Sequence, residues 1–410
     1  MRKKLDLIMN SILLQTIKNG FTSISSLTIV ASVFVLLTNF PIQSVNNFMI
    51  DNFSLLWLDI LPSISASFYS LISVYIVISI SYHYSKELCL PALITSVSTL
   101  YVYLVFIPFS SINNGEYIST YYLNSNGIFF SMIIGLIVPR IIKIVYKRNL
   151  TIKLPKEVPK EVSESFESII PLLLVLTGAT IINILIKSTS YNNIPNLIMK
   201  ILQEPITYLG GTLIAVVIIN FGVSFFWFFG FNGSFLFKSI TTPVFTTLSI
   251  ENINALSAGK DAPNIITATF QSVFINYGGS GSTLALIVAI LITCKNIKLK
   301  QLAKLSFIPG LFNINEPIVY GIPIILNPIL FFPLVICPVI NTILAYFSMY
   351  FKIVSYTNGI QLPWTTPPFI SGFLSSGISG LFLQVCLLVL NVLIYLPFVK
   401  KLDNSSKQFF

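Results

Sequence analysis

A single carboxylate, Glu316, stands in a part of the chain that is rich in apolar residues and in proline. Residues 307–340 read FIPGLFNINEPIVYGIPIILNPILFFPLVICPVI and contain six prolines, together with the amides of Asn313, Asn315 and Asn327. A charge at bilayer depth costs at least about 2.5–3.5 kcal/mol, so it normally faces a cavity and marks a functional site. Broken backbone at that depth is tolerated only where protein or a wet cavity surrounds it. The pattern therefore predicts a transporter binding site around Glu316.

A run of aromatic residues and glycines, FGVSFFWFFGFNGS at 221–234, could supply further contacts. Gly230 and Gly233 permit a turn that would expose Asn232. Trp227 could act as a sugar platform, because its flat face suits the C–H face of a pyranose and its indole N–H can donate to a hydroxyl. Taken singly, these aromatic side chains are explained more simply as lipid-facing or interfacial filler.

Glycine is concentrated again in NYGGSGSTL at 276–284. This run places Gly278, Gly279, Ser280 and Gly281 in succession, which would present backbone N–H groups and hydroxyls in a concave turn. Such a turn could bind phosphate, carboxylate or sugar hydroxyls. It is not a Walker loop, since no Gly-Lys-Ser/Thr follows, and close helix packing explains the glycines equally well.

A second tryptophan, Trp364, lies among prolines in PWTTPP at 363–368. An interfacial position at the end of a membrane span is the simpler interpretation. Together with Trp227 it could instead enclose a sugar between two aromatic faces. No cluster of metal-ligating residues accompanies these motifs, so neither a metal nor another cofactor is expected.

The composition is that of a polytopic membrane protein. Of the 410 residues, 54% are hydrophobic and 9% are charged, whereas a soluble domain averages about 25% charged residues. Long apolar runs predict an all-α protein and exclude a β-barrel, which would show short alternating segments. The net charge of +10 is interpreted as a bias of cytoplasmic loops rather than as a nucleic-acid patch. The four scattered cysteines are interpreted as buried apolar filler.

Membrane topology follows from the apolar windows and from the basic residues. Windows of about 20 residues predict about ten transmembrane helices, and the interrupted segments at 235–258 and 303–317 are predicted to form two re-entrant hairpins. Lysine and arginine are absent from 41–63 and 109–126 but abundant in 139–160. The first two loops should therefore be external and the third cytoplasmic. Basic residues at both ends place both termini in the cytoplasm, which requires an even number of spans.

The polar segment TIKLPKEVPKEVSESFES at 150–167 divides a chain that is otherwise predicted to be one membrane domain, 1–410. The front part, 1–190, consists of plain apolar helices, whereas 191–410 is rich in glycine, proline and asparagine. That composition predicts the substrate machinery in the rear part. The polar segment itself is interpreted as a solvated connector, although it could also dock a cytoplasmic partner.

These motifs, in this order, resemble the EIIC permease component of a phosphoenolpyruvate-dependent sugar phosphotransferase system (PTS), in the lactose/cellobiose/chitobiose family. The resemblance covers nearly the whole chain: the start IMNSILLQTIKNGFTSISSLTIVASVFVLL, the block NINALSAGKDAPNIITATFQSVFINYGGSGSTLAL, the signature FNINEPIVYGIPIILNPI, and LPWTTPPFISGFL with IYLPFVK near the end. It implies ten transmembrane helices with two re-entrant hairpins, a homodimer formed through 1–190, and an elevator-type movement of 191–410. No EIIA or EIIB domain is expected to be fused to the chain.

The resemblance also implies roles for individual residues. Glu316 matches the family glutamate that holds the reacting sugar hydroxyl, and an ionised carboxylate there could accept its proton. Trp227 and Trp364 match aromatic contacts to the sugar rings. The glycine-rich turn at 278–281 matches the turn near the sugar, and Asn313, in the family signature, is expected among the substrate-binding residues.

One residue departs from the family pattern. Where the family usually has Phe-Gly-aliphatic-His-Gly, this chain has Phe229-Gly230-Phe231-Asn232-Gly233. Asparagine can donate and accept hydrogen bonds but does not titrate near neutral pH. Help from an imidazole at the reacting hydroxyl, worth roughly 10²–10⁴-fold in typical enzymes, would be lost. Phosphotransfer is therefore expected to suffer more than transport.

The resemblance implies a multi-pass permease of the bacterial plasma membrane that imports a β-linked disaccharide related to cellobiose, lactose or chitobiose. A separate phospho-EIIB, supplied through EIIA and HPr, would phosphorylate the 6-hydroxyl of the sugar, so the chain would be only part of an enzyme. One alternative is a divergent facilitator or sensor that does not phosphorylate, because of Asn232. An ion-coupled secondary transporter is a further alternative that composition alone does not exclude.

Overall fold

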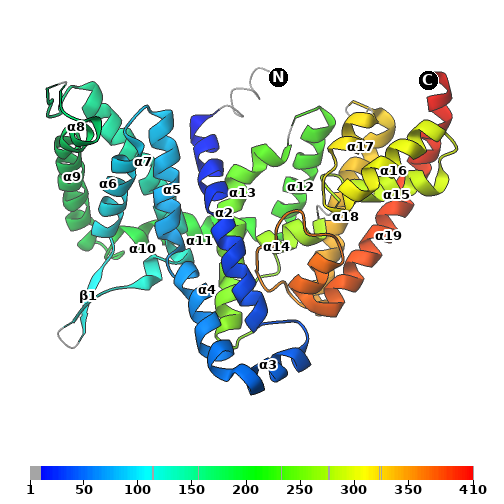
Figure 1. The fold of residues 1–410 in the computed structure, drawn as a ribbon, viewed down its shortest axis with the longest axis horizontal. Helices are drawn as coiled ribbons and strands as arrows, with labels where there is room; N and C mark the ends of the chain where they lie inside the picture. The colour runs from blue at the N-terminus through cyan, green and yellow to red at the C-terminus, as the bar shows by residue number, and fades with distance from the viewer. Residues whose placement is uncertain are drawn as a thin grey trace. The chain divides into compact units, whose positions relative to one another are not determined.

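The computed structural model describes residues 11–112, 115–155, 157–231, 233–275, 278–322, 324 and 326–409. In these residues the secondary structure is helical apart from one two-stranded hairpin. The chain forms two compact units, one made of Met1–Ala31 and Ser65–Tyr208 and the other of Ser32–Ile64 and Leu209–Phe410. Figure 1 shows the elements of both units with their labels.

The first unit is built around α5. Its helices are the first part of α2 (Ile12–Thr38), the end of α4 (Leu61–Tyr69), α5 (Ile72–Glu87), α6 (Ala92–Val105), α7 (Ile128–Lys147), α8 (Lys160–Glu167), α9 (Ile169–Lys187), α10 (Ile194–Ile198) and most of α11 (Glu204–Gly210), with short 3-10 turns at Thr120–Tyr122 and Ser125–Gly127 and a π-turn at Met199–Gln203. Helix α5 packs against α6 and α7, and Ile72, Ile76 and Ile80 on one of its faces are fully buried. A Cβ atom on Gly20 or Gly135 would approach the Ile80 side chain to 2.5 or 3.0 Å. Small residues on the neighbouring helices therefore permit this close packing.

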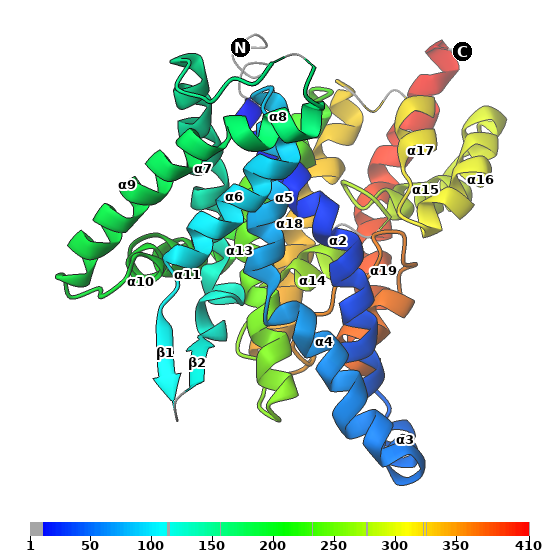
Figure 2. The same ribbon diagram turned by 60° about the vertical axis from the view of Figure 1, so that its left-hand side comes forward.

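A β-hairpin lies between α6 and α7. Strands β1 (Phe109–Ile112) and β2 (Gly115–Ile118) pair antiparallel, with Phe109 opposite Ile118 (Figure 2). The hairpin falls at the start of the 109–126 loop, where no helix is expected, and pairing satisfies backbone groups that an irregular loop would leave to solvent. The predicted all-α class is confirmed, with this short hairpin as a local addition within a loop.

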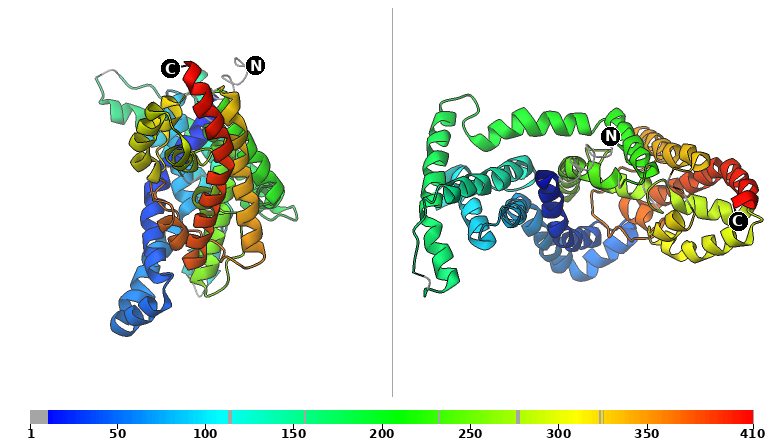
Figure 3. Two further views of the ribbon diagram at one scale, coloured as in Figure 1. Left: turned by 90° about the vertical axis from the view of Figure 1, so that its right-hand side faces the viewer. Right: turned by 90° about the horizontal axis from the view of Figure 1, so that it is seen from above.

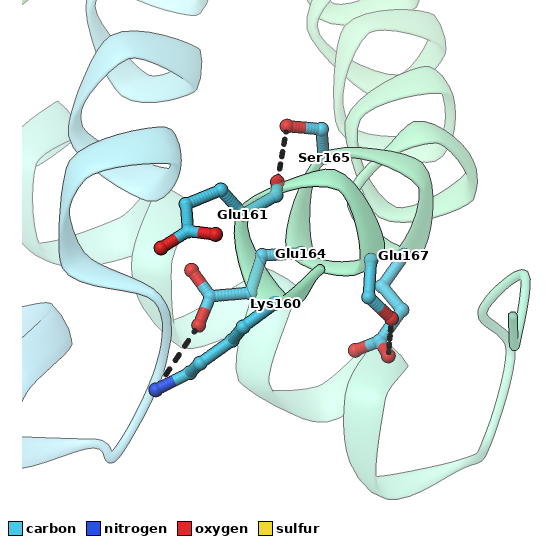
Figure 4. Close-up of polar contacts among 6 residues, drawn as sticks. Lys160, Glu161, Glu164, Ser165 and Glu167 are labelled. Carbon is cyan, nitrogen blue, oxygen red and sulfur yellow. Dashed lines mark hydrogen bonds and ion pairs between the residues drawn. The ribbon is translucent and has the colours of Figure 1, made fainter. Parts of the chain in front are cut away.

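The polar segment at 150–167 contains α8, which is an amphipathic surface helix. Lys160 Nζ lies 3.6 Å from Glu164 Oε1, and Ser165 Oγ donates a hydrogen bond of 2.9 Å to the backbone carbonyl of Glu161 (Figure 4). A solvent-exposed ion pair one turn apart contributes little to stability. These contacts are those of a solvated helix rather than of a buried element.

The second unit contains the glycine- and proline-rich part of the chain. Its helices are the end of α2, α3 (Gln43–Leu55), the start of α4, α12 (Leu213–Phe228), α13 (Gly233–Ser257), α14 (Ala268–Phe270), α15 (Thr283–Thr293), α16 (Ile297–Leu311), α17 (Glu316–Gly321), α18 (Pro328–Tyr350) and α19 (Ile370–Phe409), with π-turns at Leu56–Ile60 and Gln271–Ile275. Helix α15 packs against α16 and α19, and α18 runs beside α19 (Figure 3, left). Leu284, Leu286, Ile287 and Ile290 are at most 1% exposed. Helix α15 is therefore enclosed on several sides and forms the centre of this unit.

Residues 32–64 belong to the second unit although they come from the front of the chain. The backbone N–H of Gln361 donates to Ser32 Oγ at 2.9 Å, and the ring of Phe40 meets that of Phe373 edge-on at 6.3 Å. The predicted division into residues 1–190 and 191–410 therefore does not describe how residues 32–64 pack. The roles predicted for the front and rear parts, dimerisation and transport, stay predictions.

Six helical stretches of the described chain are long and apolar enough to cross a membrane: Ile12–Thr38, Gln43–Glu87, Ser125–Lys147, Lys160–Lys187, Pro328–Tyr350 and Ile370–Asn404. The pair Ile194–Gly210 and Leu213–Phe228, bent by 73°, would make a seventh. The segment 235–258 lies, apart from its last residue, within the single helix α13, whereas 303–317 extends from α16 to the start of α17. A multi-helical membrane fold is thus confirmed, and the count of ten spans and two re-entrant hairpins stays a prediction.

Candidate functional site

The glycine-rich run forms a tight left-handed turn between the π-turn at Gln271–Ile275 and α15. Gly278, Gly279 and Gly281 have φ of +72°, +94° and +82°, and Ser282 has φ of +54°. Glycine adopts this backbone region without strain, whereas other residues do so at a cost. A turn is therefore present in the described part of 276–284, and its predicted concave, ligand-binding character stays a prediction.

Two of these glycines also lie too close to neighbours to carry a side chain. A Cβ atom on Gly279 would lie 2.6 Å from Asn315 Cγ, and one on Gly281 would overlap the Leu334 side chain. Close packing therefore accounts for the glycines at these two positions in a turn that is buried or half-buried, and a binding role for the turn stays a prediction. The Asn315 side chain, which is 8% exposed, is held against the turn.

Asn313 connects the glycine turn to the segment that carries Trp364. Its Oδ1 accepts a hydrogen bond from the backbone N–H of Gly278. Its Nδ2 donates to the backbone carbonyls of Trp364 at 2.8 Å and Thr366 at 3.1 Å. Asn313 itself has φ of +62°, a conformation that asparagine tolerates better than most residues. In this structure Asn313 positions other parts of the site, and a direct contact with substrate stays a prediction.

Buried polar side chains support the turn from α15, α18 and α19. Thr283 Oγ1 donates to the carbonyl of Gly278, and Tyr395 OH donates to the carbonyl of Gly281 at 2.7 Å. Asn341 Nδ2 donates to Ser282 Oγ at 3.0 Å. The sequence analysis did not identify these supports. A signal was present, since Asn341 interrupts an apolar spanning helix, where polar side chains are costly and usually functional.

The end of α12 carries Trp227 into a capped turn. The N–H of Gly230, which has φ of +81°, donates to the Trp227 carbonyl at 3.0 Å. The N–H of Leu326 donates to the Phe228 carbonyl at 2.9 Å, which fixes the end of α12 against the chain preceding α18. Trp227 is half-buried, and its Nε1 is buried without a hydrogen-bond partner among the described residues.

Asn232 lies outside the described residues, but the residues after it are well placed relative to the glycine turn. A Cβ atom on Gly233 would overlap the Val223 carbonyl, so α13 begins in close contact with α12. Ser234 Oγ lies 3.5 Å from Ser280 Oγ. The first turn of α13, which begins one residue after position 232, therefore lies beside the glycine turn.

Among the predicted site residues that the structure describes, Glu316 and Trp364 have exposed side chains. Glu316 is the first residue of α17 and is exposed, and Trp364 is 67% exposed. Glu316 directly follows Asn315, whose side chain packs on Gly279. The backbone of Glu316 therefore lies next to the glycine turn. The structure brings together the glycine turn, Asn313 and the Trp364 backbone. It gives no contact between the side chains of Glu316, Trp227 and Trp364.

The cysteines and the acidic residues show no sign of metal chemistry in the part of the chain that the structure describes. No three His, Cys, Asp or Glu side chains converge there. Cys294 and Cys337 are buried, but Cys89 and Cys386 are exposed, so the interpretation of all four as buried filler is wrong for two of them. A cysteine on a helix that faces lipid would still be an apolar filler residue.

Comparisons with known proteins identify relatives over the whole chain. A family model described as "Phosphotransferase system, EIIC" matches residues 18–338. The chain is 33% identical over 406 residues to the "PTS system oligo-beta-mannoside-specific EIIC component" of Bacillus subtilis (strain 168), which covers 97% of this chain and 91% of the relative. It is 30% identical over 408 residues to the "PTS system cellobiose-specific EIIC component" of Geobacillus stearothermophilus, covering 96% of this chain and 90% of that one.

A solved structure shares the fold. The crystal structure of the transporter ChbC, the IIC component of an N,N'-diacetylchitobiose-specific phosphotransferase system, superimposes with a TM-score of 0.94 at 32% identity. The match covers 100% of this chain and 98% of ChbC. The similarity therefore extends to both compact units and to every segment of the candidate site.

Proposed function

The chain belongs to the phosphotransferase-system EIIC family, and from this premise we propose that it is a sugar permease that imports a β-linked disaccharide. We further propose that a separate phospho-EIIB phosphorylates the 6-hydroxyl of that sugar during uptake. The observation that carries the proposal is the linkage of the glycine turn through Asn313 to the Trp364 segment, beside the exposed carboxylate of Glu316. Oligo-β-mannoside, cellobiose and chitobiose in the names of similar proteins all support a β-linked sugar.

The chemistry proposed for Glu316 is that of a hydrogen-bond acceptor and general base. The phosphorus–sulfur bond of a phosphocysteine on EIIB would break as a bond forms from the sugar O6 to phosphorus. The proton of the 6-hydroxyl would pass to the Glu316 carboxylate and from there to solvent. The exposed position of Glu316 leaves room for a sugar hydroxyl and for the donor to approach it.

Trp227 is proposed to bind the sugar through its ring face and its indole N–H. The Nε1 atom has no partner among the described residues, and a buried donor without a partner costs about 1–3 kcal/mol. A sugar hydroxyl could accept this hydrogen bond and recover that cost. Trp364, which is more exposed, is proposed to cover another face of the sugar.

The second unit is proposed to contain the moving, substrate-binding part, and the front helices the homodimer interface. Both termini are proposed to lie in the cytoplasm of a bacterium, since Lys400 and Lys401 follow the last apolar stretch. EIIB, which carries the phosphoryl group, would then dock on the cytoplasmic side of the membrane.

A second candidate function is a facilitator or sensor that binds sugar without phosphorylating it. The specific observation in its favour is Asn232, which stands where the family usually has histidine. An amide can hold a hydroxyl but cannot exchange a proton with it near neutral pH. This candidate predicts sugar binding that is independent of phosphoenolpyruvate.

Phosphorylation of a β-disaccharide panel in membrane vesicles separates these functions. Vesicles containing the full chain would receive phosphoenolpyruvate, the soluble PTS proteins and an EIIB of the cellobiose or lactose class. Formation of a disaccharide 6-phosphate, lost in Glu316→Gln, would support the permease. Saturable binding with no phosphorylated product would favour the facilitator or sensor, and uptake driven by an ion gradient would favour a secondary transporter.

A further inference from the structure

A separate cavity lies in the second unit and shares no lining residue with the candidate sugar site. Its volume is about 580 Å³, within the range of roughly 300–1,000 Å³ typical of small-molecule sites. It lies where the end of α2, the end of α13, the segment after α18 and the start of α19 meet. Its lining consists of Asn39, Pro41, Leu256, Asp261, Ala262, Lys352, Val354, Ser355, Tyr356, Asn358, Leu374, Ser375, Ser376 and Gly377.

A break in α19 supplies one wall of this cavity. Ser376 has φ of −142° and ψ of 17°, and Gly377 has φ of +68° and ψ of −159°, so neither residue is helical. Ser376 is 5% exposed, and its Oγ has no hydrogen-bond partner among the described residues. A buried hydroxyl without a partner is unfavourable.

The polar groups of the lining suit an uncharged ligand with several hydroxyls. Asp261 and Lys352 carry opposite charges and are both exposed, yet they form no ion pair with each other. The pair therefore presents one strong acceptor and one strong donor without a net charge. Asn39 uses its Nδ2 in hydrogen bonds to Val35 and Thr38, which leaves its Oδ1 as a further acceptor.

The cavity and the candidate sugar site lie along the same extended segment of chain. Asn358, which lines the cavity, is held by hydrogen bonds from its N–H to the Ser375 carbonyl at 3.0 Å and from its Nδ2 to the Leu374 carbonyl at 2.9 Å. Six residues later, the carbonyl of Trp364 accepts the hydrogen bond from Asn313. Six extended residues span at most about 20 Å, so the two places are close enough for a disaccharide to pass between them.

The length of α19 puts the cavity at the other end of the spanning helix from the basic C-terminal residues. From Gly377 to Lys400 a helix rises about 35 Å, which exceeds the roughly 30 Å of the hydrocarbon core. With the C-terminus in the cytoplasm, as proposed above, the cavity opens on the external side. This orientation agrees with the absence of lysine and arginine from residues 41–63, which begin at the cavity wall.

We propose that this cavity is an outer glycoside-binding site, where a neutral disaccharide is bound before it reaches the site beside Glu316. The proposal rests on the proposed function for the identity of the ligand and for the orientation of the chain. It adds a second place of recognition, with Asn39, Asp261 and Lys352 as contacts to sugar hydroxyls. An anionic lipid headgroup is disfavoured as the occupant, because the charges of Asp261 and Lys352 in the lining cancel.

Site-directed labelling tests occupancy of the cavity by sugar. Ser355, which is exposed and lines the cavity, would be changed to cysteine in a full-length chain whose four native cysteines are replaced by serine. The matched control is Lys260→Cys, which is exposed and next to the lining residue Asp261 but is not itself part of the lining. A membrane-impermeant maleimide would be added to intact cells with and without cellobiose, chitobiose or lactose.

The proposal expects Ser355→Cys to be labelled from outside, and one of these sugars to slow that labelling several-fold without affecting Lys260→Cys. The protection should persist at the same sugar concentration when Trp227→Ala weakens the inner site. Protection that disappears with Trp227→Ala would overturn the proposal, because it would report a conformational change caused by the inner site. Sugar binding measured on the purified protein without any protection of Ser355→Cys would overturn it while leaving the proposed permease intact. Absence of sugar binding altogether would instead overturn the proposed function and this proposal with it.

A cavity-filling variant provides an independent measurement. Ala262→Trp would occupy part of the cavity, and Ala258→Trp, on an exposed position outside the lining, is its control. We expect Ala262→Trp to raise the KM for uptake of external sugar several-fold, while phosphorylation of sugar supplied from the cytoplasmic side is unchanged. An unchanged KM in Ala262→Trp, with the protein folded and phosphorylating internal sugar, would contradict an outer site.

Discussion

Asn313 Oδ1 accepts a hydrogen bond from the backbone N–H of Gly278, a residue 35 positions earlier in the chain. The same side chain donates to the carbonyls of Trp364 and Thr366, about fifty residues later. One amide thus holds together three segments that the family resemblance assigns to the sugar. The arrangement explains why a carboxamide, with a donor and an acceptor on one rigid group, is required at this position.

Asn313→Asp should therefore weaken sugar binding by roughly tenfold. The acceptor to Gly278 would remain, but the donor to the Trp364 and Thr366 carbonyls would be replaced by a carboxylate oxygen that repels them, and a lost hydrogen bond typically costs about 0.5–1.5 kcal/mol. Isothermal titration of a β-disaccharide into purified protein would measure the change. Sugar affinity equal to that of the unmodified chain would show that the Trp364 segment is positioned by other contacts.

Gly279→Ala should disrupt the glycine turn. The new Cβ would lie 2.6 Å from Asn315 Cγ at a φ of +94°, and such backbone strain costs about 1–3 kcal/mol. We expect a lower Tm in thermal unfolding and weaker sugar binding. Gly178→Ala is the control, since no atom lies within 4 Å of its Cβ position, and a helical glycine replaced by alanine should be neutral or stabilising. A Gly279→Ala protein as stable as the Gly178→Ala protein would mean that the turn adapts.

The multi-helical membrane fold and the existence of the glycine turn could be predicted because they depend on local information. Hydropathy along 20 residues decides whether a helix can span a membrane, and successive glycines predict positive φ whatever surrounds them. The supports of the turn could not be predicted in the same way. Tyr395 and Asn341 reach Gly281 and Ser282 only because α18 and α19 pack beside α15, and that packing depends on contacts between distant residues.

The role of Asn313 shows a second limit of sequence reasoning. Its place in the family signature suggests contact with substrate, yet its hydrogen bonds in this structure go to Gly278, Trp364 and Thr366. Similarly, residues 32–64 pack with the second unit, although their place in the chain groups them with the front helices. Residue type identified the important positions, whereas the partner of each side chain depended on the tertiary fold.

Glu316→Gln should abolish phosphorylation while leaving sugar binding measurable. Glutamine preserves the size and hydrogen-bonding capacity of the side chain but removes the base, and a general base contributes roughly 10²–10⁴-fold to rate. Phosphorylation by phospho-EIIB and equilibrium binding would be measured on the same preparation. Glu204→Gln, which changes an exposed carboxylate of the first unit, is the control. Unaltered phosphorylation in Glu316→Gln would remove Glu316 from its proposed role.

Two substitutions at Trp227 should separate its two proposed interactions with sugar. Trp227→Phe keeps an aromatic face but removes the N–H that has no partner in the described chain, whereas Trp227→Ala removes both. We expect Trp227→Ala to weaken sugar affinity more than Trp227→Phe, with the aromatic face contributing about 0.5–1.5 kcal/mol. Equal affinity of both variants and the unmodified chain would assign Trp227 to packing between helices.

Asn232→His should raise phosphotransfer if the pocket otherwise retains the geometry of the family. An imidazole can accept a proton when neutral, and its ordinary pKa of about 6.5 makes this form dominant above that pH. The increase in phosphotransfer rate over the unmodified chain should therefore grow as the pH rises through that value. General acid–base catalysis contributes about 10²–10⁴-fold in typical enzymes, which is the largest increase expected. The rate of sugar 6-phosphate formation from pH 5.5 to 8 would measure it, with Asn232→Gln, which cannot titrate, as the control. A rate for Asn232→His that does not exceed that of Asn232→Gln at any pH would show that the pocket has been rebuilt around asparagine, and the facilitator or sensor would then be the better account of this chain.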